Sequence, residues 1–324
     1  MLLDAFRRPL LFVGGKGGVG KTSLASALAV ARARTGERVL VVSTDPAHNL
    51  GHLWRIEAGD APVRLGRFGG GVVDGVEIDP QATIDRHLAA VEGTMLSMLP
   101  ERQHGPAHTH LERARHAPGS HESAVLERIA EFVEAGRTDY DAVIFDTAPS
   151  GHTLRLLALP GQLAGWTETL LRNRDRSERF SAAMRGLTGA PDAQAEAQSD
   201  LRRALQRRRD RFAAMQQAVA DPAQCGFAVV FTAEALPVAE TLEVVANLRG
   251  MGVAVGALIA NRRSPADAGE LLAARRTVED AHLRHVRDAV PDAAVIEIPL
   301  IAGELTGVQA LVALADTLVE AERI

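Results

Sequence analysis

Short apolar runs recur along the chain, and longer segments with helical periodicity separate them. The runs are bounded by Gly, Pro or charged residues and occupy positions 10–14, 38–43, 72–78, 142–145, 225–232, 253–260 and 295–298. Each run has the length of a buried strand, and the alternation predicts an α/β fold with a mostly parallel sheet flanked by helices. Ligands of such sheets bind where the strands end, so the loops at 14–22, 43–50 and 146–153 are the candidates for chemistry.

Two stretches interrupt this alternation. Between 80 and 122, apolar residues recur every three or four positions, which predicts a helix with one apolar face. These residues are Ile84, Leu88, Val91, Met95 and Met98. Between 161 and 220, two further apolar patterns flank a segment at 186–199 whose Ala, Gly, Gln and Pro content favours a mobile linker. We therefore predict a core formed by residues 1–79, 123–160 and 221–324, with a helical subdomain inserted at 80–122 and 161–220.

The distribution of lysine singles out one loop. Among the 36 basic residues, only Lys16 and Lys21 are lysine. Both lie in a loop that follows the first predicted strand and reads Gly15, Lys16, Gly17, Gly18, Val19, Gly20, Lys21, Thr22, Ser23. Residues 15–22 match the phosphate-loop pattern G-x-x-x-x-G-K-[ST]. An ammonium is a compact point charge and a guanidinium is a wide planar fork, so a narrow loop around phosphates accommodates lysine better than arginine.

The pattern gives each part of this loop a task, and a helix is expected to begin near Thr22 and to end at Gly36. The glycines let backbone N–H groups converge on phosphates, and the helix directs its positive end at them. Lys21 would reach the β- and γ-phosphates, and the Thr22 hydroxyl would ligate Mg²⁺. The alternative is a glycine-rich turn without a ligand, which fits the position between a strand and a helix less well.

Two carboxylates follow other predicted strands. Asp146 ends the run at 142–145, where phosphate-loop enzymes place a carboxylate associated with magnesium, and the alternative is an ordinary acidic residue at a strand end. Asp45 closely follows the run at 38–43. Its carboxylate would orient or deprotonate the attacking water, coordinate magnesium through water, or cap a helix, and the sequence does not separate these roles.

The overall composition narrows the class of protein. It contains 46% hydrophobic and 24% charged residues, which is ordinary for a soluble globular protein, and its net charge is −5. The negative charge argues against a nucleic-acid partner, and no apolar run approaches the length of a membrane span. Cys225 is the only cysteine, which rules out an intrachain disulfide and fits a reducing cytoplasm.

Together the motifs resemble the ArsA family of ATPases, which includes arsenite-pump drivers and the targeting ATPase for tail-anchored proteins. The resemblance covers nearly the whole chain. Residues 15–22 resemble the family's deviant phosphate loop, 45–50 its switch I and 146–157 its switch II, while 231–241 and 298–311 resemble two further segments. By this resemblance, the switch residues include Pro46, His48, Thr147, Pro149, Gly151 and His152. Asn261 corresponds to the residue that reads adenine, with Pro299 and Leu300 beside the base.

The resemblance implies ATP and Mg²⁺ as cofactors, and a homodimer in which Lys16 reaches the partner's nucleotide. It also implies the water-activating role for Asp45. Two family features are missing: one cysteine cannot build a three-thiolate arsenite site, and there is no Cys-x-x-Cys pair to share zinc. The apolar faces of the insertions fit either a groove for a hydrophobic client helix or plain packing.

Three functional hypotheses stay open. The first is a cytosolic homodimeric ATPase that loads or releases a membrane-protein client. The second is an ATPase subunit that energises an anion efflux pump in the membrane. The third is a partition or scaffold ATPase, for which the expected basic surface is not seen.

Two polar segments are interpreted as surface features. The histidines of the segment 104–121 fit a mobile polar loop better than a metal site, because no cysteine or regular helical spacing accompanies them. They are His104, His108, His110, His116 and His121. The arginine-dense stretches at 172–179 and 202–211 fit solvated faces.

Overall fold

The computed structural model describes residues 4–45, 49–98, 104–116, 119–136, 138–147 and 193–321. The chain divides into two compact units. One comprises Met1–Ile78, Phe132–Arg155 and Gln217–Ile324, and the other comprises Asp79–Glu131 and Leu156–Gln216. The division into a core and two insertions with the boundaries given above stays a prediction. The apolar pattern expected at 163–187 lies outside the described residues.

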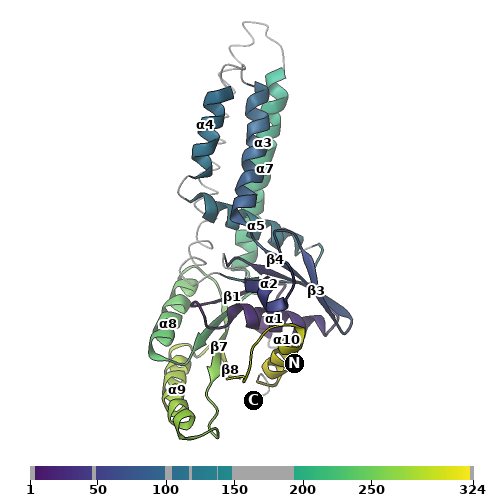
Figure 1. Cartoon of the computed structure of the whole chain (residues 1–324). Helices are drawn as coiled ribbons and strands as arrows, with labels where there is room; N and C mark the ends of the chain where they lie inside the picture. Colours follow the sequence, from purple (N-terminus) through teal and green to yellow (C-terminus); the bar gives the residue numbers. More distant parts are fainter. Residues whose placement is uncertain are drawn as a thin grey trace. The chain divides into compact units, whose positions relative to one another are not determined.

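An eight-stranded sheet forms the first unit, in the order β3-β4-β2-β5-β1-β6-β7-β8 (Figure 1). All neighbouring strands are parallel except β3 and β4. The strands are β1 (Leu10–Gly15), β2 (Arg38–Ser43), β3 (Val63–Phe68), β4 (Gly71–Glu77), β5 (Ala142–Asp146), β6 (Cys225–Thr232), β7 (Val255–Arg263) and β8 (Ala294–Pro299). The predicted α/β fold with a mostly parallel sheet is confirmed.

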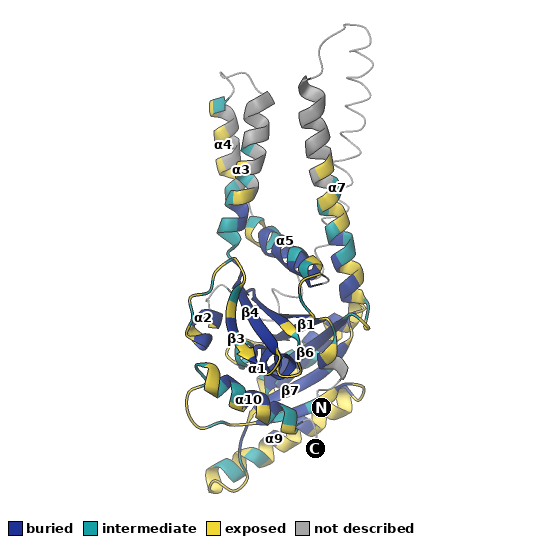
Figure 2. Cartoon of the chain, turned by 90° about the vertical axis from the view of Figure 1, so that its right-hand side faces the viewer, coloured by how far each residue is buried: buried dark blue, intermediate teal, exposed yellow. Residues whose placement is uncertain are grey.

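Both faces of the sheet are apolar because both are covered. The described helices of this unit are η1 (Asp4–Arg7), α1 (Lys21–Ala33), α2 (Asn49–Trp54), α8 (Ala235–Gly250), α9 (Glu270–Ala289) and α10 (Val308–Ala321). Leu11 and Val13 of β1 share one buried cluster with residues of α1 and α10. Between them, Phe12 points to the other face and stacks on Phe145, with ring centroids 4.5 Å apart. Figure 2 shows the buried central strands and α1 in dark blue. Burial on both faces explains why these strands read as continuous apolar runs.

Besides the short helix η1, two elements of this unit were not predicted. Strand β3 lies at the edge of the sheet, and only Leu65 and Phe68 of its sequence VRLGRF are buried, so it does not form an apolar run. It pairs with β4 in antiparallel register, with an irregularity between Arg64 and Gly66. Helix α2 is six residues long and begins inside the segment expected as switch I.

In the residues that the structure describes, the second unit consists of helices. They are α3 (Pro80–Met98), α4 (His104–Arg115), and most of α5 (Ser120–Ala135) and α7 (Ala193–Ala220). The helix predicted from the apolar spacing at 84–98 is confirmed as α3. Among the described helices, none combines the length and apolar character needed to cross a membrane.

Two loop predictions for this unit were wrong. The histidine-rich segment forms α4 over residues 104–115. Pro106 does not prevent this helix, because it lies in the first helical turn, where a missing N–H costs nothing. Within the part of the chain that the structure describes, no group of three His, Cys, Asp or Glu side chains is placed to hold a metal ion. Of the expected mobile linker at 186–199, residues 193–199 are helical, because Ala, Gln and Glu favour a helix, and residues 186–192 lie outside the described residues.

Candidate active site

The glycine-rich loop connects the carboxyl end of β1 to the amino end of α1. Gly15, Gly18 and Gly20 have φ angles of 140°, 77° and 95°, in the region that favours glycine. A Cβ atom at Gly15 would lie 2.1 Å from the carbonyl oxygen of Val230 in β6. Gly20 is also the N-cap of α1 and supplies no capping side chain. The first backbone N–H groups of α1 are therefore available to an anion.

Lys21 is the first residue of α1, and only 6% of its surface is exposed. Its Nζ donates a hydrogen bond to the carbonyl oxygen of Lys16 at 2.8 Å. Burial lowers the pKa of this ammonium, while the nearby carboxylates of Asp146 and Asp45 act in the opposite direction. The structure thus brings Lys21 and the two predicted carboxylates into one electrostatic cluster.

Asp146 ends β5 and is completely buried. Its Oδ2 accepts a weak hydrogen bond from Ser43 Oγ at 3.4 Å, and its Oδ1 is buried without a hydrogen-bond partner among the described residues. Burial raises the pKa of Asp146 to about 6, against the opposing effects of the Thr22 hydroxyl and the Lys21 ammonium. A buried carboxylate oxygen that lacks a donor is costly unless a cation or a bound water completes it.

Asp45 follows β2 and is half-buried. Its Oδ2 accepts a hydrogen bond from Asn49 Nδ2 at 3.3 Å, at the start of α2. Its backbone N–H points to Ser43 Oγ at 3.4 Å. Because β2, β5 and β1 are neighbours in the sheet, the strand ends gather Asp45, Asp146 and the glycine loop at one edge.

Asn261 joins the glycine loop to the region expected to hold the base. It lies in β7, is 6% exposed, and donates a hydrogen bond from Nδ2 to the carbonyl oxygen of Val19 at 2.8 Å. Its Oδ1 accepts from the backbone N–H of Arg262 at 2.9 Å. Leu300 N–H in turn donates to the Arg263 carbonyl oxygen at 2.8 Å. Pro299, the last residue of β8, and Leu300 are exposed to solvent.

Lys16 does not join the carboxylate cluster. Its Nζ donates to Glu240 Oε1 on α8 at 2.6 Å, a contact that the sequence analysis missed. Of the expected switch residues, Thr147 is buried and its Oγ1 donates to the Val13 carbonyl oxygen at 2.9 Å. The others lie outside the described residues, namely Pro46, His48, Pro149, Gly151 and His152.

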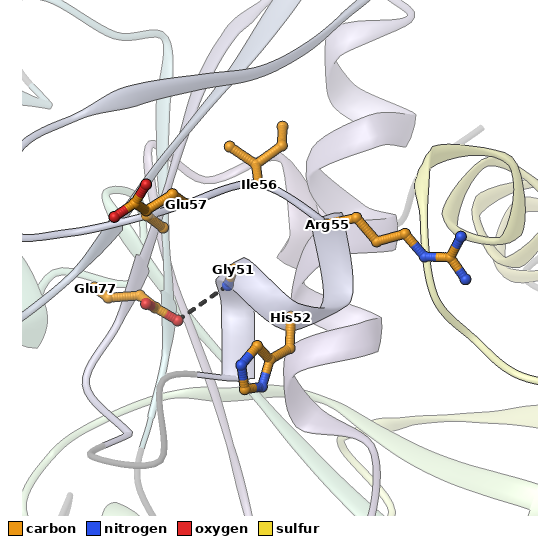
Figure 3. Close-up of a pocket in the computed structure, with 7 residues that line it drawn as sticks. Gly51, His52, Arg55, Ile56, Glu57 and Glu77 are labelled. Atoms are coloured by element: carbon orange, nitrogen blue, oxygen red, sulfur yellow. Dashed lines mark hydrogen bonds between the residues drawn. The ribbon is translucent and has the colours of Figure 1, made fainter.

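A pocket of about 730 Å³ lies beside α2 (Figure 3). Glu77, at the end of β4, directs its carboxylate at the start of α2 and accepts from the backbone N–H groups of Leu50 and Gly51 at 2.8 and 3.0 Å. His52 and Arg55 also line this pocket. Glu77 thus caps the helix that carries Asn49. The sequence analysis missed this role, because its only signal was an acidic residue at the end of a strand.

The sequence model of the ArsA family of anion-transporting ATPases matches residues 8–320. The chain belongs to the ArsA family. An ATPase GET3 of Malassezia globosa is 28% identical, and the alignment covers 98% of this chain and 92% of that protein. An arsenical pump-driving ATPase of Aquifex aeolicus is 30% identical over 93% of this chain and 96% of its own length. An ASNA1 homologue of Trypanosoma cruzi is 31% identical over 96% of this chain and 90% of that protein.

Membership makes this ArsA-family protein an ATP-binding ATPase. The names of its relatives divide between pump-driving and other ATPases, at similar identities. The family assignment therefore establishes the reaction and leaves the biological partner to be inferred.

Proposed function

We propose that this ATPase works as a cytosolic homodimer that hydrolyses ATP to ADP and phosphate and uses the cycle to load or release a hydrophobic membrane-protein client. The observation that carries the catalytic part is the cluster of Lys21, Asp45 and Asp146 at the mouth of the glycine loop. Loop amides and Lys21 stabilise phosphate charge, and Asn261 with Pro299 and Leu300 holds the base.

The residues present fit Mg²⁺. The buried Asp146 Oδ1 lacks a hydrogen-bond donor among the described residues, and magnesium prefers oxygen ligands with several waters retained. Thr22 would hold the ion through its hydroxyl and Asp146 through a water, with Asp45 as a further outer ligand. Magnesium supplies charge neutralisation at the phosphates.

Asp45 is the proposed base that orients the attacking water. It is only half-buried, and Asn49 at the start of α2 holds one of its carboxylate oxygens in place. Asp146 is less suited to this task because it is fully buried, so its carboxylate cannot reach a water in the solvent-facing site. In-line attack then needs the water between Asp45 and the γ-phosphate.

The dimer is inferred from the family, whose members are typically dimeric. In the proposed dimer, Lys16 of each chain serves the partner's ATP. The client hypothesis is favoured over arsenite-regulated pumping because Cys225 is 3% exposed within β6, and burial raises the pKa of its thiol to about 12. A thiolate site for arsenite cannot form from such a residue.

The test of catalysis is Asp45→Asn, with Asp288→Asn on the exposed end of α9 as the matched control. Asp45→Asn should bind Mg-ATP normally and lose turnover by about 10²-fold or more. The control should keep both properties. Turnover near normal in Asp45→Asn would remove Asp45 from the proposed role.

The partner is tested separately by capture from lysate on Asp45→Asn held in ATP. Recovery of proteins with a single hydrophobic span supports client targeting. Recovery of one polytopic membrane protein supports the alternative, an ATPase subunit of an anion efflux pump.

A further inference from the structure

The contact between Lys16 and Glu240 follows from the strand order. Strands β1 and β6 are parallel neighbours, with Gly15 opposite Val230. The glycine loop leaves β1 and α8 follows β6, so both emerge at the same edge of the sheet. The second turn of α8 thus presents Glu240 to the ammonium of Lys16, and the two atoms Nζ and Oε1 lie 2.6 Å apart.

This ion pair is short but reversible. The exposed fractions of the two side chains are 44% for Lys16 and 33% for Glu240, so water and salt compete for both. A charge-assisted hydrogen bond of this kind is directional. Exposed pairs nevertheless shift an equilibrium by only about fivefold at most.

Both lysines of the loop are therefore held by oxygen atoms of their own chain. Lys21 donates to the Lys16 carbonyl oxygen, and Lys16 donates to Glu240. The Lys16 ammonium cannot remain at 2.6 Å from Glu240 and also extend away from its chain to a second nucleotide. Glu240 and a partner's phosphates are thus competing acceptors for one cation.

We propose that Glu240 is a latch that holds Lys16 on its own chain and sets the ATP concentration at which two chains close around nucleotide. This inference rests on the proposed function, in which Lys16 serves the partner's ATP. Glu240 acts through Lys16 and is a positioning residue. Loss of its negative charge frees the ammonium and favours the closed dimer at lower ATP.

The test compares Glu240→Gln with Glu243→Gln, an exposed acidic residue three positions further along α8. Both are built on Asp45→Asn, so that the dimer fraction is measured against ATP concentration by analytical ultracentrifugation without turnover. Glu240→Gln should lower the midpoint concentration two- to fivefold, and Glu243→Gln should leave it unchanged. In the chain with Asp45 intact, Glu240→Gln should keep kcat at saturating ATP.

If Glu240→Gln leaves the midpoint ATP concentration for dimer formation unchanged, or raises it, the latch is overturned. A fall in kcat at saturating ATP also overturns it, because Glu240 would then be needed after Lys16 has moved. Lys16→Ala separates this from failure of the proposed function. If Lys16→Ala leaves closure and turnover intact, the role of Lys16 in the dimer is wrong. If Lys16→Ala abolishes closure while Glu240→Gln has no effect, only the latch is wrong.

Discussion

Replacing Arg263 by methionine should destabilise the protein by about 3 kcal/mol at neutral pH, the lower end of the cost of breaking a buried ion pair. Arg263 ends β7 and is 1% exposed. Its guanidinium contacts Glu279, Asp280 and Glu297, with Nε donating to Glu297 Oε2 at 2.8 Å. Methionine has a similar volume, so the change removes charge and hydrogen bonds without leaving a large cavity.

Most of the expected loss comes from Glu279, whose side chain is 5% exposed. In the variant it keeps Ser264 as a partner, with Oγ at 2.7 Å and the backbone N–H at 3.0 Å, and it keeps Arg275 at 3.0 Å. These bonds place the cost at the lower end of the range. Asp280 is 51% exposed and Glu297 keeps two other arginines, so their contributions are small.

The sign of the pH dependence gives a second measurement. Burial alone would raise the pKa of Glu279, but hydrogen bonds from Ser264 and Arg275 and the charge of Arg263 hold it below the usual value of 4.5. A depressed pKa contributes stability above pH 4.5 that is lost as the pH falls through the folded-state pKa. Without Arg263 this pKa rises. The difference in free energy of unfolding between the variant and the unaltered protein should therefore shrink between pH 7 and pH 4.

Urea unfolding at several pH values measures both effects, with Arg275→Met as the control. Arg275 contacts the same Glu279 but its side chain is 51% exposed, so its loss should cost less than about 1 kcal/mol. A deficit below about 1 kcal/mol for Arg263→Met, or one that stays constant down to pH 4, would refute this reasoning.

Two further outcomes are expected. Gly20→Ala should weaken ATP binding, measured by equilibrium dialysis, more than Gly18→Ala does. Both positions have positive φ, but of the two only Gly20 would place a Cβ 2.5 Å from Asn261 Nδ2. Equal effects of the two substitutions would contradict this. Tyr140, the only tyrosine, should titrate near pH 12 by ultraviolet absorbance, because burial and the charge of Asp74 raise its pKa to about 12. Stability should therefore fall between pH 10 and pH 12, and a titration midpoint near pH 10 would contradict the cause assigned.

The sequence predicted the central strands because burial on both faces makes them continuous apolar runs. Strand β3 escaped prediction because Arg64 and Arg67 interrupt its apolar positions at the sheet edge. Helix α2 escaped because its capping carboxylate, Glu77, lies 27 residues from Leu50. Sequence patterns describe residues that are close along the chain, whereas β3 and α2 depend on residues that are close only in the folded structure.

The same limit applies to the active site. The glycine loop, Asp45 and Asp146 were identified because each belongs to a contiguous motif at a strand end. The bonds from Lys16 to Glu240 and from Asn261 to Val19 join residues 224 and 242 positions apart. Only the strand order brings these pairs together, and no local pattern encodes it.

The unequal exposure of Lys16 and Lys21 bears on covalent modification. No other lysine exists in the 324 residues, Lys21 is 6% exposed, and the Lys16 side chain is 44% exposed. Acetyltransferases and amine-reactive dyes thus meet one accessible side-chain amine, and it lies in the phosphate loop. Acylation there removes the charge that binds Glu240. Among the side-chain amines, a lysine-directed label would therefore report on the loop, and lysine acetylation would fall on a residue of the phosphate loop.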